Sequence, residues 1–140
     1  MNNLNSLRNL YRLEYDHSGF KSSLIDWYNS VIDKSVDELS VLDVSKMVRQ
    51  NILREVAIDR AIELFFIDPF DGEIKNGDLL ALLVSCSAEV VNNKKAETLA
   101  SRMANLENEI SGFDWVDEDE KMQFIQNKIS LETILRKNPL

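Results

Sequence analysis

The chain has few of the residues on which catalytic, metal-binding and disulfide-rich proteins depend. Its 140 residues include one cysteine, Cys86, and one histidine, His17. A single cysteine excludes an intrachain disulfide, and this pair cannot complete a zinc tetrahedron without carboxylates. Nucleophilic catalysis through a histidine would have to use His17, which precedes Ser18-Gly19 in an expected loop between helices. We therefore expect no catalytic residues, no metal site and no cofactor.

Glycine and proline are also scarce, with four and two residues respectively. Such a chain is unlike an all-β protein, which needs many tight turns. Neither G-x-G-x-x-G nor a Walker sequence occurs, so no glycine-rich phosphate cradle is expected. The loop that begins at Asp68 resembles a calcium loop only superficially, because Phe70, Gly72 and Leu79 occupy the third, fifth and twelfth ligand positions.

Long apolar runs are missing as well. The longest apolar-rich stretch, Leu79 to Val84, is far shorter than the roughly 18 residues that a membrane span needs. The first 18 residues lack a basic stretch followed by an apolar run, which a secretory signal would have. These absences predict a cytoplasmic protein that does not bind membranes.

Acidic residues outnumber basic ones, and the formal net charge is −8 with a sequence pI near 4.7. A negative surface repels phosphate backbones, so direct binding of nucleic acid is not expected. The same charge accelerates encounter with a basic protein partner. On its own, the charge is more simply explained by a surface that only keeps the protein in solution.

Apolar residues recur mainly at helical spacing. The clearest stripe contains Leu24, Trp27, Tyr28, Val31 and Ile32, at positions i, i+3, i+4, i+7 and i+8. We predict an all-α protein in which residues 1–140 form a single compact bundle of about six to eight helices. Predicted helices lie at about residues 4–11, 24–32, 44–56, 58–66, 79–84, 96–110 and 117–135, with a turn-rich loop or a very short hairpin at 70–78.

The run at residues 114–120, DWVDEDE, is densely acidic and contains an aromatic residue. One interpretation is the first turn of a helix, where the helix dipole stabilises carboxylates. The other is a contact surface for a basic partner, with the tryptophan as an anchor and the carboxylates steering its approach. The candidate contact residues are Asp114, Trp115, Asp117, Glu118 and Asp119 in this run, and Asp71 and Glu73 in the mid-chain loop.

The middle of the chain contains a recognisable succession of short motifs. It reads LSVLDV from residue 39, VRQN from 48, AIEL from 61, DP at 68–69 and GDLL from 77. This order resembles immunity proteins of bacterial contact-dependent growth inhibition (CDI) systems, over about residues 39–84. The resemblance implies that most shared residues are structural. Core positions would be Val48, Ala61, Leu64, Leu79 and Leu80, and Asp68-Pro69 would end a helix.

The resemblance further implies a helical cytoplasmic protein that binds one cognate toxin domain delivered by a neighbouring cell. Such toxins are commonly nucleases with a basic cleft, which an acidic inhibitor can cover. Our first hypothesis is therefore an immunity protein that blocks the toxin's active site, as a monomer or weak homo-oligomer. The alternatives are a helical regulatory or adaptor protein in an unrelated pathway and, third, a small enzyme that uses His17.

Overall fold

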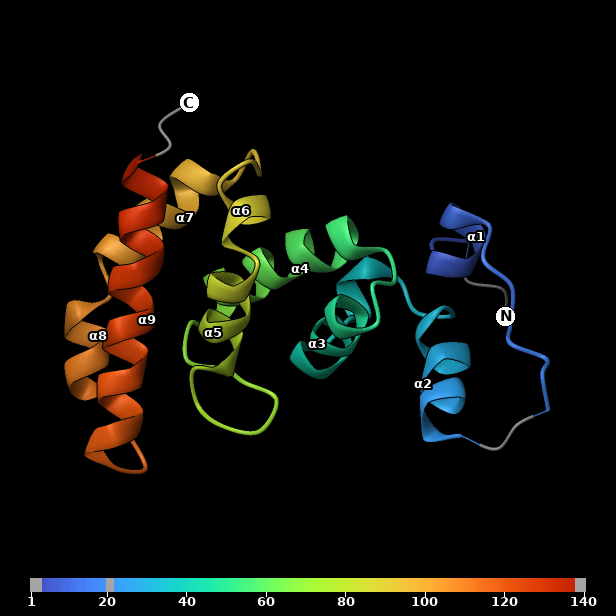
Figure 1. Cartoon of the computed structure of the whole chain (residues 1–140), viewed down its shortest axis with the longest axis horizontal. Coiled ribbons are helices and arrows are strands. Elements are labelled where there is room, and N and C mark those ends of the chain that lie inside the picture. Colours follow the sequence, from blue (N-terminus) through green and yellow to red (C-terminus); the bar gives the residue numbers. More distant parts are fainter. Residues whose placement is uncertain (1–3, 20–21, 138–140) are drawn as a thin grey trace.

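Helices account for all the regular structure in residues 4–19 and 22–137, which are the residues that the computed structural model describes. The chain runs along the long axis of the molecule from α1 and α2 at one end to α8 at the other, and α9 then returns to lie between α8 and α5 (Figure 1). The predicted all-α class is confirmed. The helices are α1 (Leu7–Tyr11), α2 (Ser23–Val31), the 3-10 helix η1 (Val36–Glu38), α3 (Val41–Arg49), α4 (Arg54–Ile67), α5 (Asp78–Ser85), α6 (Ser87–Val90), α7 (Ala96–Ala104), α8 (Glu107–Gly112) and α9 (Glu118–Lys137).

The nine α-helices of the described residues slightly exceed the predicted six to eight, and one cause is a division in the helix expected at 96–110. Helix α7 ends before Asn105, which leaves the helical region with φ −105° and ψ 20°. The side-chain amide of Asn105 donates a hydrogen bond to the carbonyl of Ser101 at 2.9 Å, and α8 begins two residues later. The second cause is the short helix α6 that follows α5.

A tight reversal divides the apolar seam expected at 44–56. Helix α3 ends at Arg49 and α4 begins at Arg54, with two non-glycine residues in the left-handed region between them: Asn51 with φ 54° and Leu53 with φ 44°. Asparagine tolerates this conformation, whereas leucine rarely adopts it. The reversal lets α3 and α4 pack against each other. Helix α4 then ends immediately before Asp68-Pro69, as predicted.

Two reciprocal hydrogen bonds cap the N-terminus of α3. Ser40 is the N-cap residue, and its hydroxyl accepts from the backbone nitrogen of Asp43 while the Asp43 carboxylate accepts from that of Ser40. The same carboxylate accepts from Trp27 Nε1 at 3.0 Å and from Lys34 Nζ at 2.7 Å. Asp43 therefore joins α2 to α3 and is a partner within a capping box.

One cluster of buried side chains extends from Leu7 of α1 to Leu131 of α9. In its middle, α5 packs against both α4 and α9. The expectation that the shared motif residues are core residues is confirmed for Val48, Ala61, Leu79 and Leu80, which are buried, and Leu64 packs half-buried against the cluster. Within the described residues, every helix is too short or too polar to cross a membrane.

Candidate functional site

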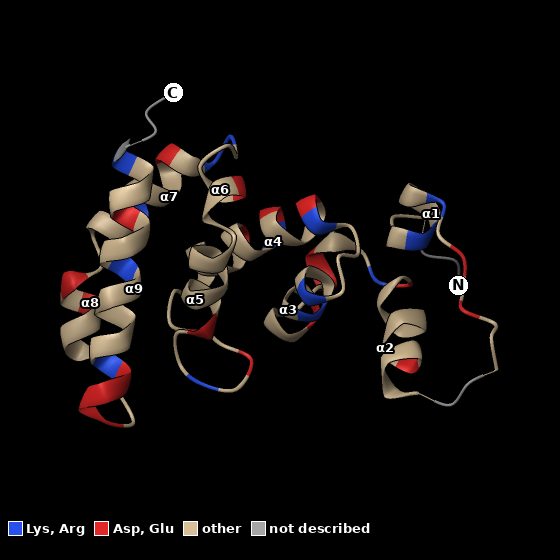
Figure 2. Ribbon diagram, viewed as in Figure 1, with Lys and Arg blue, Asp and Glu red and all other residues tan. Residues whose placement is uncertain are grey.

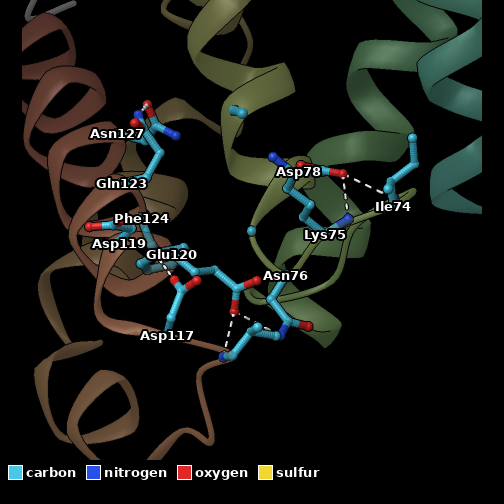
Figure 3. A pocket seen from close by; sticks show the side chains of 13 residues that line it. Ile74, Lys75, Asn76, Asp78, Asp117, Asp119, Glu120, Gln123, Phe124 and Asn127 are labelled. Carbon is cyan, nitrogen blue, oxygen red and sulfur yellow. Dashed lines mark hydrogen bonds between the residues drawn. The ribbon is translucent and has the colours of Figure 1, made fainter.

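The two acidic segments named from the sequence meet at one end of the molecule. The loop at residues 68–77 lies beside residues 113–117 and the first half of α9, because α5 packs against α9. Glu120 joins the two segments: its Oε1 atom accepts from Asn76 Nδ2 at 3.0 Å and from the backbone nitrogen of Val116 at 3.1 Å (Figure 3). Residues more than 40 positions apart in the sequence thus form one surface.

A groove of about 600 Å³ lies between these segments. One wall comes from the loop and the start of α5, and the other comes from the acidic run and α9 (Figure 3). Four carboxylates and a single lysine contribute to its lining, so the groove carries net negative charge. The lining residues are Ile74, Lys75, Asn76, Gly77, Asp78, Ala81, Val116, Asp117, Asp119, Glu120, Gln123, Phe124 and Asn127.

The loop wall is held in shape by its own hydrogen bonds. Asp78 Oδ2 accepts from the backbone nitrogens of Ile74 at 3.0 Å and Lys75 at 2.8 Å. Gly77 adopts φ 85°, and a Cβ atom on it would lie 3.0 Å from the Phe124 ring of α9. The glycine therefore supplies both a left-handed turn and a close approach between the two walls.

Trp115, the candidate anchor for a partner, packs against residues of its own chain. It is half-buried, and its Nε1 atom donates to the carbonyl of Ile110 at 2.9 Å. Its ring stacks on Phe113 with centroids 4.5 Å apart, forms a T-shaped pair with Phe70 and is tilted against Phe124. This cluster fastens the acidic run to the loop. A direct contact of Trp115 with a partner stays a prediction.

The acidic residues around the start of α9 are exposed. Asp117 Oδ1 accepts from the backbone nitrogen of Glu120 at 2.8 Å and so caps the helix. Glu118 and Asp119 lie in the first turn, where the helix dipole stabilises them, and Asp114 is exposed nearby. Both interpretations of the run are therefore compatible with the structure, because dipole stabilisation leaves these side chains accessible.

The two loop candidates have different surroundings. Asp71 is exposed, and its carboxylate accepts from the backbone nitrogen of Gly72 at 2.8 Å. Glu73 binds the Arg49 guanidinium through both oxygens, at 2.9 and 3.0 Å, and its side chain is only 18% exposed. The hydrogen bonds from Arg49 lower the pKa of Glu73 despite an opposing effect of burial. Glu73 thus already has a cationic partner within the chain.

Sequence reasoning missed two exposed apolar residues of the groove, Ile74 and Val116. Their exposed fractions are 85% and 77%, and they belong to opposite walls. An isolated aliphatic residue inside a polar loop or an acidic run was the available signal. Asp78 and Glu120 were also missed as groove residues, although both were noted in their motifs.

The structure gives little support for a metal site or for a catalytic site at His17 or Cys86. In the described part of the chain, no group of three or more His, Cys, Asp or Glu side chains could hold a metal ion. His17 is exposed in the segment after α1, with its ring edge toward Tyr15 at a centroid distance of 6.2 Å. Cys86 is buried beside Arg54.

Comparison with known proteins identifies a family for this chain. No curated protein matches the chain. The family model for CDI immunity proteins matches residues 9–100, about two thirds of the chain, and includes the motifs between residues 39 and 84. The loop wall of the groove lies inside the matched segment, and the acidic run at 114–120 lies beyond it. The chain belongs to the CDI immunity protein family.

Proposed function

We propose that the chain neutralises its cognate CDI toxin by binding the toxin's catalytic domain and blocking the active site. The binding surface is the groove face, which we define as the groove and the exposed acidic residues at the start of α9. The observation that carries this proposal is the groove itself. Its two walls present carboxylates that form no salt bridge with any described residue, together with two strongly exposed aliphatic side chains. Exposed apolar residues framed by charge are typical of protein-binding surfaces.

The charge of this face favours a nuclease as the toxin. Within residues 4–19 and 22–137, no Lys or Arg nitrogen forms a salt bridge with Asp78, Asp117, Asp119 or Glu120, whereas Glu73, Glu89 and Glu109 all have arginine partners. A nuclease cleft binds phosphates with basic side chains, and unpaired carboxylates are complementary to them. The inhibitor would then act in the cytoplasm of the cell that receives the toxin.

The extent of the family match suggests how specificity is divided. The matched residues 9–100 contain the loop wall, whereas the start of α9 lies outside them. A toxin-specific surface benefits from a variable segment placed on a common scaffold. We therefore assign recognition of the individual toxin mainly to residues 114–120.

Reversal of the charges at the start of α9 tests this proposal. The variant carrying Asp117→Lys, Glu118→Lys and Asp119→Lys is expected to bind the C-terminal domain encoded by the neighbouring toxin gene at least about tenfold more weakly. Asp117 and Asp119 line the groove, and Glu118 lies between them in the chain. A control reverses Glu55, Glu97 and Glu107, which are exposed first-turn carboxylates of other helices and lie outside the groove. Calorimetric titration measures both affinities, and growth of cells expressing the toxin domain measures protection.

Equal weakening by the two triple variants would show that only overall charge matters and would remove the groove face from the interface. If the unaltered protein neither binds the toxin domain nor protects cells, the immunity role itself is wrong. The regulatory or adaptor hypothesis would then be the one to pursue.

A further inference from the structure

Helix α9 carries a line of apolar side chains on the side that faces away from the core. Met122 and Ile129 are 45% and 55% exposed, and Ile125 between them is half-buried. These three residues, which we call the α9 seam, follow one another at the spacing of the a and d positions of a coiled coil. The buried residues Phe124 and Leu131 lie on the other side of the helix. The α9 seam is thus placed to pack against another helix.

Opposite charges flank the α9 seam. Glu118 precedes Met122 by four residues and Arg136 follows Ile129 by seven, so both continue the same spacing. Both are exposed, and neither forms a salt bridge with a described residue. They stand at opposite ends of a helix of 20 residues, about 27 Å apart along its axis. They therefore cannot pair with each other within one molecule.

One arrangement of two copies brings together both the charges and the apolar residues. Two α9 helices that pack antiparallel about a two-fold axis can place Glu118 of each copy beside Arg136 of the other. The same register places Ile125 of each copy beside Ile129 of the other, because both pairs are centred on residue 127. A parallel pair would instead bring like charges together at both ends, which is unfavourable. The charges therefore select the antiparallel orientation.

We propose that this protein forms a weak homodimer through α9, in which the two seams pack antiparallel and Glu118 of each copy pairs with Arg136 of the other. The contact is a strip about 30 Å long and 10 Å wide, which is smaller than the roughly 800 Å² that each partner contributes to a standard interface. The net charge of −8 on each copy opposes association further. The dimer therefore forms reversibly and at high protein concentration.

Glu118 also belongs to the groove face, so the toxin would compete with the second copy for the start of α9. This consequence alone rests on the proposed function. The homodimer itself is tested without any toxin, and its failure would leave the proposed function standing.

Sedimentation equilibrium of the full chain tests the dimer. The average mass should rise from 16.1 kDa towards twice that value between micromolar and millimolar protein. Ile129→Lys should weaken the association at least about tenfold, because a cation replaces an apolar contact in the middle of the interface. Ile67→Lys is the control, since Ile67 is 72% exposed at the end of α4, outside the α9 seam. A mass that stays monomeric, or equal weakening by both variants, would overturn the inference.

Exchange of the flanking charges tests the antiparallel register. Glu118→Arg alone and Arg136→Glu alone each place like charges at both ends of the dimer, and each should weaken self-association about threefold to tenfold. An equimolar mixture of the two variants restores both opposite-charge pairs in the heterodimer, which should form about as readily as the unaltered dimer. Circular dichroism checks that each variant keeps its helix content. If the mixture associates no better than the separate variants, the proposed dimer is wrong.

Discussion

Gly72 occupies a position in the 68–77 loop where a side chain has no room. A Cβ atom there would lie 1.8 Å from the carbonyl oxygen of Lys75 and 2.8 Å from Asp78 Cβ. Because the nearest atom belongs to the backbone, the loop would have to move. Gly72→Ala should therefore lower the free energy of unfolding by about 2 kcal/mol, measured by urea denaturation, and should shift the amide signals of the groove's loop wall.

Gly112 provides the control for this prediction. It ends α8, and an added Cβ would meet nothing within 4 Å. Gly112→Ala should leave the free energy of unfolding unchanged or raise it by up to about 1 kcal/mol, since alanine favours the helix. Equal destabilisation by both substitutions would contradict the steric explanation at Gly72.

Some residues of the groove could be predicted from the sequence and others could not. The carboxylates of the acidic run were recognised as candidates because their density is visible in the sequence. Ile74 and Val116 were not, because a single aliphatic residue in a polar segment is a weak signal that does not distinguish an exposed side chain from a buried one. Trp115 was named as an anchor, but its contacts with Phe70 and Phe124 depend on residues far away in the chain.

At the scale of elements, the junction of α2 and α3 depends on one buried carboxylate. Burial alone would raise the pKa of Asp43, but hydrogen bonds from Lys34, the backbone of Ser40 and Trp27 outweigh it, and the pKa lies below its usual value. A carboxyl group whose pKa is lowered by folding stabilises the protein above its unfolded pKa of about 3.9. That contribution disappears as the pH falls from there through the folded pKa.

Asp43→Asn should consequently lower the free energy of unfolding by about 2 kcal/mol at pH 7, because charge-assisted hydrogen bonds are lost. The difference from the unaltered protein should shrink as the pH falls below about 4. Urea denaturation at pH 7, 5 and 3.5 measures it. Asp33→Asn is the comparison, since this exposed partner of Arg8 should contribute less than about 1 kcal/mol. A difference that stays constant with pH would contradict the assignment.

Helix positions were predictable where local chemistry determines them. The stripe at 24–32 and the stop at Asp68-Pro69 correspond closely to α2 and the end of α4. The breaks after Arg49 and at Asn105 were missed, because neither contains glycine or proline. The first of them also depends on the packing of α3 against α4. The contact of the 68–77 loop with α9 could not be predicted from the sequence either, since it follows from the packing of α5 against α9.

At the scale of the whole molecule, the acidic residues of the groove face act together with a net charge of −8. Red segments occur at the start of α9, at the start of α5 and on α8, all toward the same end of the long axis (Figure 2). A basic toxin approaching this end would be attracted before any contact forms. Such long-range attraction mainly increases the association rate.

Salt should therefore slow the association of the toxin domain with this protein. The Debye length falls from about 10 Å at 0.1 M salt to about 3 Å at 1 M, so attraction beyond direct contact is largely removed. We expect the association rate constant to fall at least about tenfold and the dissociation rate constant to change much less. Surface plasmon resonance at several salt concentrations measures both, with the Asp117, Glu118 and Asp119 reversal as the variant whose association should depend least on salt. If salt acts on dissociation alone, the face contributes contacts but does not steer the encounter.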